Sequence, residues 1–212
     1  MSQRGIAVLI LLVGFVVSVG GSGFLLTLLR EDLHFQCSFL QMGAGDPGSF
    51  FCADGISYIG VAVSANGAHV VILLIALGIA MASPDTAGMQ SRLMAFCSIL
   101  PVAMFSWLTW DGTQHRPVDQ APDVNYWLEP LLPVTGVLCV AVVVILAAGI
   151  LTPPRLRMAG CLLAMALLVV AVFVQLGSLS AVALALGALA AAMVLETRLP
   201  TEVDSPSSTP YG

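Results

Sequence analysis

The sequence predicts an all-α fold, a polytopic membrane helix bundle with six transmembrane helices. Two observations lead to this fold class. Apolar residues make up 58% of the 212 residues and charged residues only 9%, whereas a soluble domain carries roughly 25% charged residues. In addition, apolar runs close to the roughly 20 residues that cross a bilayer alternate with segments that hold most of the charges. The first expected partner of the chain is therefore the lipid bilayer.

The first four spans are predicted from four separate apolar runs. They are Gly5–Leu29, Tyr58–Ala82, Leu93–Trp110 and Trp127–Leu151. The first run is longer than the roughly 7–15 apolar residues of a signal peptide, so we expect it to be retained as a helix. Pro101 is predicted to kink the third span, because proline lacks the N–H that a helix interior requires.

The last apolar run, Met158–Leu195, has 38 residues. As one helix it would be about 57 Å long, nearly twice the thickness of the hydrocarbon core of a bilayer. The segment 177–180 near its middle reads Gly-Ser-Leu-Ser, which is typical of a turn. We therefore predict two helices, at about 158–175 and 180–195. The alternative left open is a single tilted, kinked helix, which would make five spans in total.

The arginines predict the orientation, because cytoplasmic loops of membrane proteins carry an excess of basic residues. With both termini cytoplasmic, the arginines inside are Arg4, Arg92, Arg155, Arg157 and Arg198, and those outside are Arg30 and Arg116. Aromatic rings that prefer the membrane interface agree with this topology. At exterior span ends lie Tyr58, Trp107, Trp110, Tyr126 and Trp127.

This topology gives one transmembrane domain, residues 1–197, with exterior loops at 30–56 and 111–126. The tail 198–212 is rich in Pro, Ser and Thr, and we expect it to be disordered and cytoplasmic. Lysine is absent while arginine, alanine and glycine are used freely, which indicates a GC-rich bacterial genome. The expected location is the bacterial plasma (inner) membrane, as a multi-pass protein.

Two cysteines, Cys37 and Cys52, lie in the first exterior loop. Because thiols outside the bacterial membrane tend to be oxidised, we predict a disulfide between them, which would hold the Gly-rich segment 43–48 as a compact hairpin. A bridge of this size stabilises by roughly 3 kcal/mol in the loop-entropy model. The other cysteines lie singly within spans and are expected to act as small apolar residues. They are Cys97, Cys139 and Cys161.

A paired-cysteine exterior loop followed by Ser57-Tyr58 and a Gly-containing span is similar to the vitamin K epoxide reductase family. That resemblance covers about 25 residues and implies quinone-linked thiol oxidation. The family's catalytic pair is a CxxC motif at the exterior end of a later span, and this sequence contains no CxxC. A quinone-linked thiol oxidoreductase is therefore a remote alternative.

Polar residues inside a span are costly in lipid, so each is a candidate site. The second span contains Ser64, Asn66 and His69, which we interpret as an intramembrane polar patch that serves helix packing or a partner contact, or else proton or substrate handling. Glu129, beside Pro130 at the exterior mouth of the fourth span, is a second candidate.

Small residues recur at intervals of four in the first and last spans. The first stripe consists of Gly14, Ser18 and Ser22, and the second of Ala183, Gly187 and Ala191. Such stripes let helix backbones approach closely, because lipid supplies no hydrophobic drive for helix association. Each stripe is predicted to be a helix-packing face. The neighbour is either another helix of this chain or another protein.

The composition excludes several functions. A formal net charge of −5 argues against binding nucleic acid. Without lysine there is no Schiff base and no Walker-type phosphate loop, and HExxH, GxSxG and CxxC motifs are absent. We therefore expect no enzyme, no cofactor and no metal site.

Two functions stay open. The first is a non-catalytic integral membrane subunit that stabilises or regulates a larger membrane assembly, such as a lipid-import, transport or respiratory complex. Its partners would be other integral membrane protein subunits. The alternative is a small transporter or channel for a hydrophobic or cationic solute that uses Asn66, His69 and the acidic outer mouth.

Overall fold

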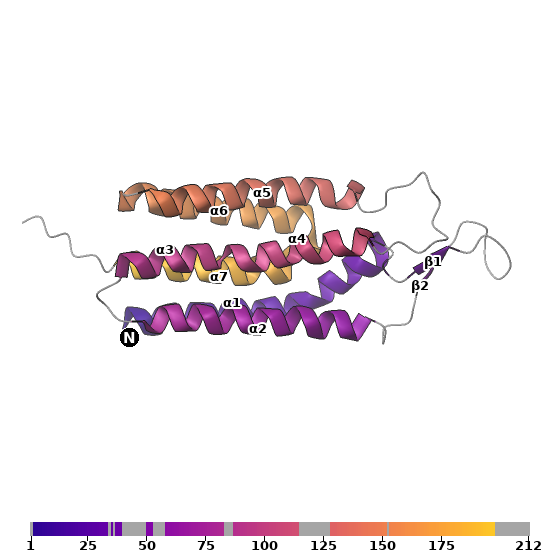
Figure 1. Cartoon of the computed structure of the whole chain (residues 1–212), viewed down its shortest axis with the longest axis horizontal. Coiled ribbons are helices and arrows are strands. Elements are labelled where there is room, and N and C mark those ends of the chain that lie inside the picture. Colours follow the sequence, from indigo (N-terminus) through magenta and orange to yellow (C-terminus); the bar gives the residue numbers. More distant parts are fainter. Residues whose placement is uncertain are drawn as a thin grey trace, which may run out of the picture.

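Among the residues that the structure describes, six helices are long and apolar enough to cross a membrane, as the sequence predicts, and they pack as one bundle with roughly aligned axes (Figure 1). The structure is a computed structural model that describes residues 2–33, 35, 37–39, 50–52, 58–82, 87–114, 128–151 and 153–197. The predicted tail at 198–212 and most of both loops that are predicted to be exterior lie outside the described residues.

The first two helices are α1, Gln3–Thr27, and α2, Ile59–Met81. The Ser2 hydroxyl caps α1 by accepting a hydrogen bond from the Gly5 N–H at 3.2 Å. A π-helical turn, η1 (Leu28–Asp32), prolongs α1. The first apolar helix is therefore about a turn longer at its C-terminal end than the apolar pattern alone predicts.

The third span is divided into α3, Ala87–Cys97, and α4, Ile99–Gln114. Pro101 explains the division, because it cannot donate to the carbonyl of Cys97, four residues earlier, and its ring crowds that carbonyl. The helix is thus interrupted at Ser98, close to the position of the predicted kink. The fourth span is α5, Leu128–Ile150, which carries Pro133 near its start.

The last apolar run folds into two helices, so the described part of the chain has six helices long and apolar enough to span a membrane, as predicted, and not five. These are α6, Pro154–Val174, and α7, Leu179–Glu196, with a 3-10 turn, η4 (Leu176–Ser178), between them. The backbone becomes extended at Gln175 (φ −149°, ψ 106°) and ends α6. The side-chain oxygen of Gln175 then accepts a hydrogen bond from the Gly177 N–H at 3.5 Å. The backbone carbonyl of Gln175 accepts one from the Ser178 hydroxyl at 2.8 Å.

The first loop, which is predicted to be exterior, contains a short antiparallel pair of strands, β1, Cys37–Phe39, and β2, Phe50–Cys52. The pair lies beyond the ends of the helices (Figure 1), so the bundle is helical with one small two-stranded addition. The compact hairpin predicted for the segment 43–48 lies outside the described residues.

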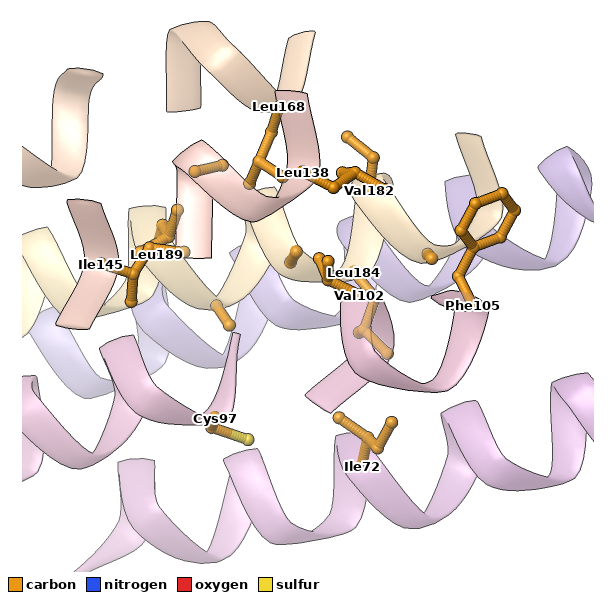
Figure 2. Packing of buried hydrophobic residues seen from close by; sticks show 14 of the residues in the cluster. Ile72, Cys97, Val102, Phe105, Leu138, Ile145, Leu168, Val182, Leu184 and Leu189 are labelled. Carbon is orange, nitrogen blue, oxygen red and sulfur yellow. The ribbon is translucent and has the colours of Figure 1, made fainter. Parts of the chain in front are cut away.

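The core of the bundle forms around α7. It is the most buried of the six long apolar helices, because 72% of the residues in its most apolar stretch are buried inside the structure. Side chains of α2, α3, α4, α5 and α6 gather around it (Figure 2). The labelled residues are Ile72, Cys97, Val102, Phe105, Leu138, Ile145, Leu168, Val182, Leu184 and Leu189. The most extensive helix pair is α1 with α7.

The turn between α6 and α7 lies inside the bundle, because the end of α1 bends across it (Figure 1). Gly177 and Ser178 are buried, and a Cβ on Gly177 would lie 2.5 Å from a Leu28 methyl group. The Gln175 amide donates to the Asp32 carboxylate at 3.3 Å. The turn between the last two helices is thus covered by the end of the first one.

Candidate functional site: polar contacts between helices

Asn66 and His69 of α2 face α1, where they meet Ser18 and Ser22. The Ser18 hydroxyl and His69 Nδ1 are 3.0 Å apart and share a hydrogen bond, and the Ser22 hydroxyl donates to Asn66 Oδ1 at 3.0 Å. The Asn66 amide also donates to the Ala62 carbonyl at 2.9 Å. This group of four side chains, the α1–α2 polar cluster, joins the predicted patch of one span to the predicted stripe of another.

Ser64 does not belong to this cluster. It is exposed on the outside of the bundle, whereas His69 is 1% exposed. Successive residues of a helix are about 100° apart, so Ser64 and Asn66, two residues apart, point to nearly opposite sides. The predicted three-residue patch is therefore corrected to Asn66 and His69.

We expect Asn66→Ala to lower the free energy of unfolding by about 0.6 kcal/mol, the average for hydrogen bonds between membrane helices, and by no more than about 1.7 kcal/mol, the maximum. The alanine removes the acceptor of the Ser22 hydroxyl. Thermal unfolding in a mild detergent measures the change. Ser64→Ala, on the exposed face of the same helix, is the matched control, and an equal loss in both variants would contradict a role for the cluster.

The two small-residue stripes also find partners inside the chain. A Cβ built on Gly14 would lie 3.0 Å from the Ala183 carbonyl oxygen and 3.2 Å from Cα of Gly187. Only glycine lets the backbones of α1 and α7 come this close. Ser18 and Ser22, from the same stripe, face α2 instead. Helix α1 therefore lies between α2 and α7.

The burial of the two stripes shows which neighbours they contact. Ala183, Gly187 and Ala191 are buried within the chain, as are Gly14 and Ser18. The stripes are packing faces, as predicted, and the neighbour is another helix of this chain. They cannot serve as evidence for an external partner.

A buried ion pair joins Arg157, in the first turn of α6, to Glu196, the last residue of α7. The two side chains are 5% and 3% exposed, respectively. Because these residues lie at the far ends of consecutive helices, their contact also shows that α6 and α7 run antiparallel. Sequence reasoning missed the pair. The sequence does contain a signal for it, because the two residues flank the last apolar run. A turn at the middle of that run places its two ends, and so these two side chains, at the same end of the bundle.

Polar side chains at the same end of the bundle bind backbone carbonyls of neighbouring helices. Gln90 donates to the carbonyl oxygens of Ala82 at 2.7 Å and Ile79 at 3.2 Å, which caps the end of α2. Ser91 donates to the Ala192 carbonyl of α7 at 3.0 Å. These bonds fix the start of α3 against both neighbours.

The start of α1 lies at this end too, because the Gln3 amide donates to the Thr197 hydroxyl at 3.4 Å. We refer to this end as the ion-pair end and to the opposite one as the hairpin end.

At the hairpin end, Tyr58 is buried and its hydroxyl donates to the Phe35 carbonyl at 2.6 Å. The phenol thus ties the start of α2 to the loop that leads into β1. Tyr58 thus lies at the end of a spanning segment, where the sequence places it, but its ring is covered by the chain. Trp107 and Trp110 are 68% and 64% exposed, as expected for side chains at a membrane interface.

The strand register pairs Cys37 directly with Cys52. Opposite residues of an antiparallel pair have Cα atoms about 4.5–5.5 Å apart, within the roughly 4.4–6.8 Å that a disulfide spans. The side chains of both cysteines lie outside the described part of the structure. The disulfide therefore stays a prediction, which the backbone register favours.

We expect protein isolated without reductant to resist alkylation at both Cys37 and Cys52, and to gain two alkyl groups there after reduction. Peptide mass spectrometry measures both states. Cys97 and Cys161, which are free but buried in the bundle, serve as internal references for thiols that are protected by burial and not by a disulfide. Alkylation of Cys37 in protein that was never exposed to reductant would contradict the disulfide.

The remaining predicted site residue, Glu129, lies in the first turn of α5, and its side chain is outside the described part of the structure. Cys97 and Cys161 are buried, and Cys139 is exposed. Within the described ranges no three His, Cys, Asp or Glu residues come together as a metal site requires.

Comparison of the chain with protein-family models, with curated proteins and with solved structures found no match.

Proposed function

We propose that this chain is a six-span protein of the bacterial inner membrane with both termini in the cytoplasm, and that it acts as a non-catalytic subunit of a larger membrane assembly. The insertion is supported by the exposed surface of the bundle. Large apolar side chains cover it on every spanning helix except α7, with examples in Val16, Leu74, Trp107, Val143 and Phe173. Exposed to water, such a surface would drive aggregation.

The orientation is supported by the arginines. Among the described residues, the ion-pair end carries Arg4, Arg92, Arg155 and Arg157, whereas the hairpin end carries Arg30. Basic residues accumulate on the cytoplasmic side. The ion-pair end is therefore assigned to the cytoplasm and the β1–β2 hairpin to the exterior.

One observation carries the functional proposal: polar side chains inside the bundle bind other helices of the chain. The α1–α2 polar cluster, the Ser91 bond to α7 and the Arg157–Glu196 pair all join neighbouring helices. A transporter needs polar groups that line a path, and an enzyme needs them where substrate reaches. Polar groups that bind neighbouring helices of the same chain instead favour a protein that acts through contacts of its surface.

Isolation under mild detergent from the native membrane tests this proposal. We expect the chain to elute with stoichiometric integral membrane proteins, identified by mass spectrometry. An alkaline wash of the membranes first tests insertion, since an inserted chain stays in the membrane pellet. Recovery of the folded chain alone, at the size of one copy, in several detergents that keep other complexes intact would contradict the subunit role.

A transporter is the second candidate, and one observation favours it. Nε2 of His69 is buried and has no hydrogen-bond partner in the structure, so one ring nitrogen is available to bind a proton or a polar solute. If His69→Asn abolished uptake while the protein stayed folded and abundant, the transporter would replace the subunit as the preferred function.

A further inference from the structure

We draw no further inference here: the strongest candidate, the strip of exposed small residues Gly60, Ser64 and Gly67 on the outward face of α2, carries nothing because nothing in the described part of the structure shows what covers it.

Discussion

Replacing Gly14 by leucine is expected to destabilise the bundle by about 2–3 kcal/mol, as overpacking of a tight contact does. Even a methyl group on Gly14 would meet the backbone of α7, at the Ala183 carbonyl oxygen and Cα of Gly187. Backbone atoms cannot rotate away as a side chain does. Helix α1 must then shift along α7, which weakens the largest contact of the fold. The midpoint of thermal unfolding in detergent measures the loss.

Gly20→Leu is the matched control, because a Cβ at Gly20 meets nothing within 4 Å. It should be neutral or slightly stabilising, since leucine favours the helix more than glycine does. Unchanged stability in Gly14→Leu would contradict the close α1–α7 contact. Loss of a partner protein in this variant would be explained by the damaged bundle, so it does not locate a docking face.

Replacing Arg157 by leucine is expected to cost about 3–5 kcal/mol, because Glu196 would be left buried without its partner charge. The double variant Arg157→Leu/Glu196→Leu should recover most of this loss, since it leaves no buried charge. Unfolding of the wild-type chain, both single variants and the double variant completes the thermodynamic cycle.

Arg155→Leu is the control for the Arg157 variant, since Arg155 is exposed two residues away. Its effect on the stability of the lipid-free protein should stay within about 0.5 kcal/mol. If the double variant were as unstable as Arg157→Leu alone, the loss would come from packing instead of from an uncompensated charge.

The positions of the helices could be predicted because each signal is local. An apolar run of sufficient length forms a helix in lipid, Pro101 interrupts one, and the segment around Gly177 ends another. The packing faces at Gly14 and Gly187 were predictable too, because only small side chains permit close approach of backbones.

The faces of the other helices could not be predicted, and α5 and α6 show why. In a soluble protein the buried side of a helix is apolar and the exposed side polar. In lipid both sides are apolar, so the pattern does not distinguish them. The apolar sequences of α5 and α6 therefore do not indicate that Val143 and Phe173 are exposed, as they are in the structure.

Local sequence signals suffice to predict six long apolar helices, the breaks between them and the small residues that permit close packing. The packing of the whole bundle is needed to show that the α1 and α7 stripes contact each other and that Asn66 and His69 face α1. The interactions behind these two sets of features differ in range. Helix formation and helix breaking depend on residues within a few turns, whereas partner choice depends on which backbones and charges can approach across the whole bundle.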